Sequence, residues 1–199
     1  AYLVDDEADT LTDLPLEQRL VLLDAPALPF DGMNERGLAV GMAAVPSAEM
    51  KTDPAKETID SLMVIRKMLD QAADVDEAVA VLQSYNIEWG SGPPLHYLIA
   101  DRSGRAVLAE FYQGELHLLP NDQSWHLATN FLRSAVSGSA SGQCSRYDRL
   151  EQGLSSVGGE INSTDAMNLL SDVSQPSTQW SVVYGIGTGD VTVSMGRQY

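Results

Sequence analysis

The chain has 199 residues, a formal net charge of −16 and a single cysteine, Cys144. The length suits one domain, residues 1–199, with a sizeable core. The acidic balance argues strongly against nucleic acid as a partner, because binding it requires a basic face. No apolar run approaches the roughly 18 residues of a membrane span, so no membrane partner is expected. One cysteine cannot form an internal disulfide, so the cysteine count leaves the cellular compartment open. The sequence also leaves open whether the protein is a homo-oligomer.

The first residues resemble the interior of a longer protein. Tyr2–Val4 has the composition of a strand fragment, and an acidic loop follows it. We therefore expect an N-terminal piece to precede Ala1, together with any targeting signal. After the loop, a short helix is expected from Leu14 to about Leu23, with Pro15 near its first turn.

The stretch Pro29–Pro46 begins as a turn and ends as an apolar strand. Asp31-Gly32 and Asn34 are turn residues. Asn34 and Glu35 are expected to fix this turn rather than to take part in chemistry. From Leu38 to Val45 every residue is apolar or glycine, which predicts a strand buried on both faces. The small side chains Gly41, Ala43 and Ala44 would let another backbone or a ligand approach closely.

Two helices and a run of strands are expected next. Apolar residues at helical spacing predict helices over Thr58–Gln71 and over Val75–Tyr85, the second capped by Asp74. Period-two patterns and turns then predict an antiparallel meander of four strands. These strands are Leu95–Ala100, Ala106–Tyr112, Glu115–Leu119 and Trp125–Asn130.

The last third returns to helices. A Ser/Gly-rich loop over Ser134–Gly142 precedes helices over Ser145–Leu154 and Ser163–Val173, the second with Ser163 as N-cap. A hairpin of Trp180–Ile186 and Asp190–Met195 closes the chain. Two groups of helices separated by antiparallel strands indicate an α+β fold with helices layered on sheets.

Five motifs, in order, resemble the linear amide C–N hydrolases, relatives of choloylglycine hydrolases and penicillin acyltransferases. The motifs are PFDGMNERGLAVGMAAVP at 29–46, HYLIADRSGRAVLAEF at 96–111, ATNF at 128–131, CSRYDRL at 144–150 and QWSVVYGIGTGDVTVSMGR at 179–197. The resemblance implies a four-layer αββα sandwich of the N-terminal nucleophile hydrolase type. It also implies a small-molecule amide substrate and no cofactor. Members of the family are mostly bacterial and occur both inside cells and exported.

The nucleophile that the resemblance implies is a cysteine at a processed N-terminus, whose own α-amino group serves as base. An α-amino group suits this role because its reference pKa is about 7.7–8.0. Ala1 offers no nucleophile, so the resemblance implies that the cysteine lies in a missing N-terminal segment or on a separate chain. This chain would then be the larger C-terminal part of the enzyme.

The family's oxyanion hole maps onto two places in this sequence. Asn130, in ATNF, matches an asparagine whose side-chain amide donates to the oxyanion. The second donor is a backbone N–H at the end of Leu38–Val45, that of Ala44, with Ala43 one residue off in register. Bile-salt-hydrolysing members tend to carry asparagine there, so the alanine does not imply bile-salt specificity.

Two further residues, Arg146 and Cys144, follow Asn130 in the sequence and are candidates for a catalytic role. Arg146 matches an arginine near the family's nucleophile, where a fixed positive charge favours the thiolate. Cys144 is internal and has no free amine, so it is interpreted as inert. The three histidines, His96, His117 and His126, lack the short spacing of metal ligands.

Aromatic residues are the remaining candidates for a binding pocket. Trp89, Tyr97, Phe131 and Trp180 could form its walls, although an aromatic core is the commoner fate of such residues. Three functions stay open at this point: an amide hydrolase, an acyltransferase of the penicillin acyltransferase type, and a non-catalytic binding domain that has lost its nucleophile.

Overall fold

The computed structural model describes residues 15–45 and 47–199, so the strand fragment expected at Tyr2–Val4 lies outside the described residues. The helices of the described chain are α1 (Leu16–Val21), η2 (Leu22–Ala27), α2 (Met63–Gln71), α3 (Val75–Gln83), η3 (Arg133–Ala135), α4 (Ser145–Ser156) and α5 (Ser163–Asp172). The strands are β1 (Asp31–Met33), β2 (Ala39–Ala44), β3 (Glu57–Asp60), β4 (Tyr85–Glu88), β5 (Leu95–Ala100), β6 (Ala106–Tyr112), β7 (Glu115–Pro120), β8 (Trp180–Gly185) and β9 (Asp190–Met195). Within the described ranges, no helix is long and apolar enough to cross a membrane.

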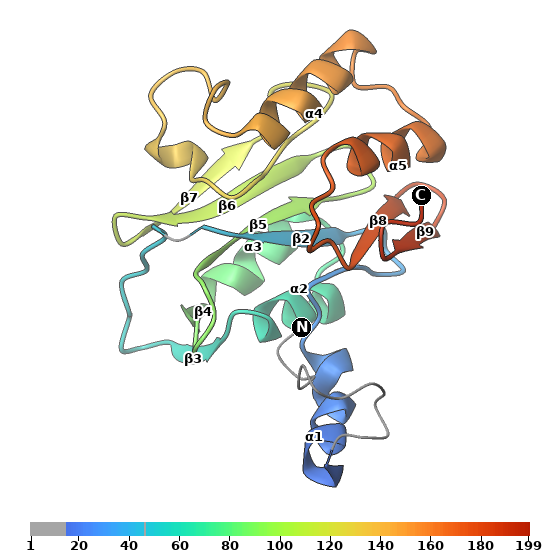
Figure 1. The fold of residues 1–199 in the computed structure, drawn as a ribbon. Coiled ribbons are helices and arrows are strands. Elements are labelled where there is room, and N and C mark those ends of the chain that lie inside the picture. The colour runs from blue at the N-terminus through green and yellow to red at the C-terminus, as the bar shows by residue number, and fades with distance from the viewer. Residues whose placement is uncertain (1–14, 46) are drawn as a thin grey trace.

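A five-stranded sheet in the order β1-β2-β5-β6-β7 forms the centre of the molecule, and every neighbouring pair in it is antiparallel (Figure 1). Helices α2 and α3 pack on one face of this sheet. The main apolar core lies between them, because alternate residues of each strand point toward the helices. Tyr97 and Phe111 are the largest fully buried side chains of this core.

The other side of the sheet carries α4, α5 and the two-stranded hairpin β8-β9 (Figure 1). Helix α5 packs against β8, and η3 contacts β6. A smaller apolar cluster, centred on Leu127, Ala140 and Tyr147, lies beneath α4. Helices thus flank the five-stranded sheet and the β8-β9 hairpin, and β3 and β4 form a further two-stranded sheet. At the other end of the chain, α1 projects away from this body (Figure 1).

Most of the predicted elements are found, and local signals place them. Asp74 caps α3 by accepting the Glu77 N–H at 2.9 Å, as expected. Strands β5, β6 and β7 and the closing hairpin match their predicted ranges within one residue. Helix α4 starts at Ser145 as predicted.

Several predictions were wrong in detail. The helix predicted from Thr58 begins only at Met63, because Glu57–Asp60 pairs with β4 as a parallel strand. The N-cap of α5 is Asn162 and not Ser163, since the Asn162 side chain accepts the Asp165 N–H at 2.9 Å. The fourth strand of the meander, Trp125–Asn130, forms no ladder with any described residue. Its period-two pattern reflects an extended segment that buries Leu127 and Thr129, but β7 already ends the sheet.

The strand predicted over Leu38–Val45 exists, but it is not buried on both faces. Within β2 only Val40 is fully buried, and the remaining residues are half-buried. A Cβ added at Gly41 would meet no atom within 4 Å. The small apolar residues therefore leave open space beside one end of the strand, and larger side chains at these positions would fill that space.

The turn before β2 is built by Asn34 and Gly37. The Asn34 side chain accepts the N–H groups of Arg36 and Leu38, each at 3.0 Å, and donates to two carbonyls at the end of α2. Its conformational role is confirmed. Asp31 and Gly32, predicted as turn residues, instead form β1. A Cβ added at Gly32 would lie 2.6 Å from a terminal methyl of Leu69, so that side chain would have to shift to admit it.

Candidate active site

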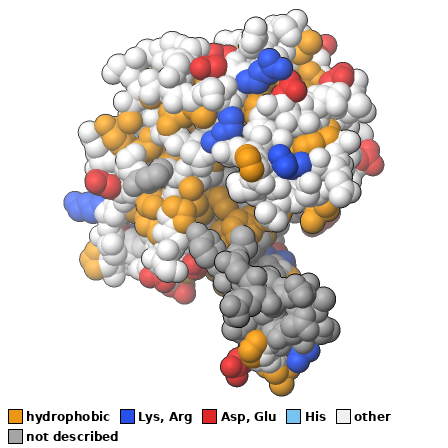
Figure 2. Space-filling view, viewed as in Figure 1, with side chains coloured by type: hydrophobic (Ala, Val, Ile, Leu, Met, Phe, Trp, Pro, Cys, Tyr) orange, Lys and Arg blue, Asp and Glu red, His pale blue; other side chains and the backbone are white. Residues whose placement is uncertain are grey.

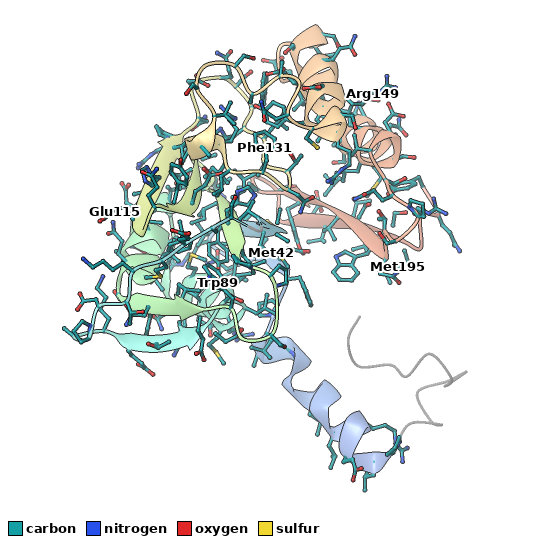
Figure 3. The ribbon with its side chains drawn as sticks, turned by 60° about the vertical axis from the view of Figure 1, so that its left-hand side comes forward. Met42, Trp89, Glu115, Phe131, Arg149 and Met195 are labelled. Atoms are coloured by element: carbon teal, nitrogen blue, oxygen red, sulfur yellow. The ribbon has the colours of Figure 1, made fainter. Side chains whose placement is uncertain are left out.

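A cavity of about 820 Å³ opens beside the end of β2. Its walls come from β2, from the loops before α2 and before β5, and from the segment before β8. Hydrophobic side chains gather across the middle of the face shown in Figure 2, and Met42 and Trp89, both of which line the cavity, lie close together in Figure 3. The apolar and aromatic lining consists of Phe30, Met42, Ala43, Ala44, Leu62, Trp89, Pro93, Leu95 and Trp180.

The backbone of Ala44 faces away from the neighbouring strand β5. The Val45 N–H donates to the Pro94 carbonyl at 2.8 Å, across the β2-β5 edge. Hydrogen-bonding directions alternate along an antiparallel strand, so the N–H and C=O of Ala44 point to the opposite edge. Strand β1 reaches only to the level of Gly41, where Asp31 pairs, and does not cover Ala44. The Ala44 N–H is therefore directed past the end of β1.

Asn130 approaches Ala44 from that uncovered edge. Its Nδ2 donates to the Ala44 carbonyl oxygen at 2.8 Å, and both residues line the cavity. The N–H and C=O of one strand residue lie on the same edge, so the Asn130 amide and the Ala44 N–H face a common space. An amide nitrogen carries two N–H groups, and the Ala44 carbonyl accepts only one of them.

Arg146, in the first turn of α4, completes a chain of three residues. Its Nη2 donates to Asn130 Oδ1 at 2.6 Å, and Arg146 also lines the cavity. A guanidinium only donates, so this bond requires the amide oxygen to face Arg146 and the amide nitrogen to face Ala44. The structure thus brings together all three residues that the sequence singled out, Ala44, Asn130 and Arg146.

The segment that follows Asn130 is held from two sides. The Glu110 carboxylate accepts the N–H groups of Arg133 at 2.9 Å and of Ser134 at 2.7 Å. The Arg133 guanidinium donates to the Tyr147 hydroxyl at 2.7 Å and lies over that ring. Neither Glu110 nor this turn lines the cavity, yet together they fix the chain just beyond Asn130.

The C-terminal hairpin contributes Trp180 to the lining of the cavity and contacts β1. Asp31 of β1 accepts hydrogen bonds from the Tyr184 hydroxyl and, at 3.3 Å, from the Trp180 indole N–H. Phe30 meets the Trp180 ring edge-on, with centroids 5.9 Å apart. Burial, followed by the hydrogen bond and the charge of Asp31, raises the pKa of Tyr184, so its hydroxyl stays a donor. These contacts close one side of the cavity.

Cys144 is the N-cap residue of α4 and is not among the residues that line the cavity. Burial raises the pKa of its thiol. The N–H groups of Tyr147 and Arg146, the Thr129 hydroxyl and the Arg146 charge outweigh that effect, so the pKa lies below its ordinary value. Cys144 thus has a thiol with a lowered pKa but lies outside the cavity.

Of the aromatic candidates, Trp89 and Trp180 line the cavity. Tyr97 lies in the main core, where its hydroxyl donates to the Ser61 carbonyl at 2.8 Å. Phe131 packs on Tyr147 beneath α4 (Figure 3). Among the residues described, no group of histidine, cysteine and acidic side chains could hold a metal ion.

Sequence reasoning missed the lining from Asp60–Leu62 and from the segment 175–179, as well as the Glu110–His96 pair. The pair did leave a signal in the sequence. Glu110 interrupts the apolar run of β6, and His96 lies at the mirror position across the Asp101–Gly104 turn of the same hairpin. A charged residue and a histidine placed directly across two buried strands predict a buried hydrogen bond.

Comparison with known proteins identifies the family. A profile of the linear amide C–N hydrolases, choloylglycine hydrolase family, matches residues 20–132, more than half of the chain. The chain belongs to this family.

Solved structures show the same fold. A variant of conjugated bile acid hydrolase from Clostridium perfringens is 18% identical, with a TM-score of 0.63 over 83% of this chain and 69% of that chain. A second mutant of that hydrolase is 17% identical, with a TM-score of 0.60 over the same shares. Penicillin V acylase from Agrobacterium tumefaciens is 21% identical, with a TM-score of 0.61 over 85% of this chain and 63% of that chain. The predicted α+β fold of the N-terminal nucleophile hydrolase type is confirmed.

Proposed function

We propose that the protein to which this chain belongs hydrolyses linear amide C–N bonds. A cysteine nucleophile from outside the residues of this sequence would attack the amide carbonyl, and the cavity beside β2 would bind the acyl group. The observation that carries the proposal is the hydrogen-bonded chain Arg146–Asn130–Ala44 at the edge of that cavity. Membership of the amide hydrolase family supports the reaction class.

The oxyanion hole in this proposal has two donors. One is the second N–H of Asn130 Nδ2, and the other is the backbone N–H of Ala44. Both face the space past the end of β1, where a tetrahedral oxyanion would lie. Preorganised donors of this kind stabilise the charge that develops in the transition state, because they need no reorganisation when it forms.

Arg146 would act on the oxyanion through Asn130. Its hydrogen bond to Oδ1 fixes which end of the amide faces the cavity. A cation on the amide oxygen also polarises the group, which makes its N–H a stronger donor. The same positive charge would favour a nearby thiolate over the thiol. Arg146 therefore orients and strengthens one donor and supports the nucleophile.

The reaction would run in two steps that use the same donors. The α-amino group of the cysteine takes the thiol proton, and the thiolate sulfur forms a bond to the amide carbon. When the tetrahedral intermediate collapses to a thioester, the C–N bond breaks and the α-ammonium group returns its proton to the leaving amine. Water, deprotonated by the α-amino group of the cysteine, then attacks the thioester and releases the acid and the thiol. Since both intermediates carry the negative charge on the former carbonyl oxygen, Asn130 and Ala44 would stabilise each of them.

The lining of the cavity favours an apolar acyl group. Phe30, Met42, Trp89 and Trp180 supply flat or flexible apolar surface, and Arg146 places a cation at the edge. Pockets with this composition bind ligands through burial of apolar area and orient them through a few polar groups.

The test uses the full-length, processed protein. We expect Asn130→Ala to lower kcat by about 10²–10³-fold with little change in KM, because one oxyanion donor is lost. Asn162→Ala is the matched control, since Asn162 also donates and accepts side-chain hydrogen bonds but caps α5 outside the cavity. The control should lose stability and keep its rate. An unchanged kcat in Asn130→Ala removes Asn130 from the site.

A further inference from the structure

Glu110 is a fully buried carboxylate that the proposed reaction does not use. Its side chain and that of His96 are both 0% exposed, and His96 Nδ1 lies 2.9 Å from Glu110 Oε1. The two residues occupy the face of the central sheet opposite α2 and α3, because their strand neighbours Tyr97 and Phe111 point into the main core. A carboxylate in such a place is costly unless its oxygens are fully hydrogen-bonded.

The hydrogen bonds of Glu110 go to one particular turn. Besides His96, its oxygens accept the N–H groups of Arg133 and Ser134, the first two residues of η3. The N-cap residue of this short helix, Leu132, makes no side-chain capping hydrogen bond. Glu110, on β6, therefore caps a helix that is distant from it in sequence. This turn begins only three residues after Asn130.

The same turn also reaches the second partner of Asn130. Arg133, whose backbone is held by Glu110, donates through its guanidinium to the Tyr147 hydroxyl. Tyr147 is buried in α4 directly after Arg146, which donates to Asn130 Oδ1. Glu110 thus supports the chain just after Asn130 directly, and through Arg133 and Tyr147 it supports α4, whose Arg146 orients the Asn130 amide.

His96 connects Glu110 to the other donor of the proposed oxyanion hole. In the β2-β5 ladder, His96 pairs with Ala43, and the next pair is Ala44 with Leu95. The His96–Glu110 contact therefore links β5, which pairs with the strand that carries the Ala44 N–H, to the turn that follows Asn130. These two donors come from segments 86 positions apart in sequence.

We propose that Glu110 is a positioning residue that fixes the distance between Asn130 and the Ala44 N–H. This inference rests on the proposed oxyanion hole. The backbone N–H groups of Arg133 and Ser134 and the His96 ring converge on the two carboxylate oxygens. In the Glu110→Gln variant, an NH₂ group would replace one of these oxygens and would face a backbone N–H donor, so the position requires a carboxylate. Loss of that fit lets the turn and Asn130 shift, and misplacements of about 1 Å cost large factors in rate.

The test is a double-mutant cycle in the full-length protein, with rates normalised to folded, processed enzyme. We expect Glu110→Gln to lower kcat by about 10–100-fold while KM changes by less than about twofold. In the Asn130→Ala background, the same substitution should add less than about twofold, because residues that act through one another are not additive. Glu110→Asp, which keeps the charge but shortens the reach, should fall between the wild type and Glu110→Gln.

A second buried carboxylate serves as the control. Asp101 is also buried and accepts backbone N–H groups, those of Val75 and Ser103, but it lies at the far end of β5 from His96. Asp101→Asn should lower the thermal midpoint and leave kcat unchanged. If Glu110→Gln behaves like Asp101→Asn, or if its loss multiplies fully with that of Asn130→Ala, Glu110 is merely structural and the inference fails. An unaltered kcat in Asn130→Ala alone would instead reject the oxyanion hole itself.

Should Glu110→Gln fail to fold, Glu110→Asp carries the test alone. Its loss in kcat must then disappear in the Asn130→Ala background. A loss that persists there overturns the proposal.

Discussion

The two faces of the central sheet do different work. The face beneath α2 and α3 is apolar, with Val40, Ile99 and Phe111 fully buried. The opposite face buries His96 and Glu110, and Glu110 accepts backbone N–H groups from the turn at Arg133 and Ser134. Apolar contacts are undirected and tolerate small shifts, whereas hydrogen bonds fix distance and angle. We infer that the first face supplies stability and the second supplies the geometry of the site.

The largest expected effect is a loss of stability on the apolar face. Phe111→Ala removes a side chain that meets both Trp89 and Tyr97 edge-on, at 5.4 and 6.3 Å between centroids. Creating such a cavity costs about 3–5 kcal/mol in the free energy of unfolding. Denaturant titration measures the loss. Leu118→Ala on the neighbouring β7 is the control, because Leu118 is exposed and its truncation should cost less than about 0.5 kcal/mol.

The next effect is on rate and concerns single backbone groups of β2. Replacing Ala44 by lactate turns its amide into an ester and deletes only the N–H. We expect kcat to fall by about 10²-fold or more, because one oxyanion donor is lost. Lactate in place of Ala43 deletes an N–H directed at β5 instead, so it should cost about 1 kcal/mol of stability and spare the rate. The reverse outcome would move the donor by one residue, to Ala43.

The smallest expected effect is a pH dependence of the unfolding free energy, which Glu110 on one face of the sheet contributes and Phe111 on the other does not. Burial raises the pKa of Glu110, but the hydrogen bonds from His96, Ser134 and Arg133 outweigh it, so the pKa lies below its ordinary value of 4.5. A lowered pKa in the folded state means that the carboxylate stabilises the fold above about pH 4.5 and that this contribution is lost as the pH falls through the folded pKa.

The measurement compares unfolding free energies between pH 7 and pH 3. The difference in unfolding free energy between wild type and Glu110→Gln should become smaller as the pH falls, because protonation of Glu110 removes the negative charge that the variant already lacks. For Phe111→Ala the gap should stay constant over the same range, because no titratable group is removed. A gap for Glu110→Gln that does not change with pH would show that its charge contributes nothing to the fold.

Local sequence signals determined most of the elements of this protein. Helical spacing placed α2 and α3, period two placed β5 to β7, and Asp74 marked the start of α3, since each signal lies within one segment. The signal failed at Trp125–Asn130, where alternation predicted a strand. Pairing requires a neighbour, and a neighbour is not a local property of a segment.

The candidate site divides in the same way. Motifs that resemble the family's own pointed to Asn130, Ala44 and Arg146 one at a time, from three separate parts of the chain. Only the tertiary structure decided that they form one hydrogen-bonded chain, with the Asn130 amide turned toward Ala44 by Arg146. The physical reason is that a sequence specifies which groups can donate and accept, while packing decides which of them meet. Glu110 shows this most clearly: a charge in an apolar run is visible in the sequence, but its partners lie on β5 and in a turn beyond β7.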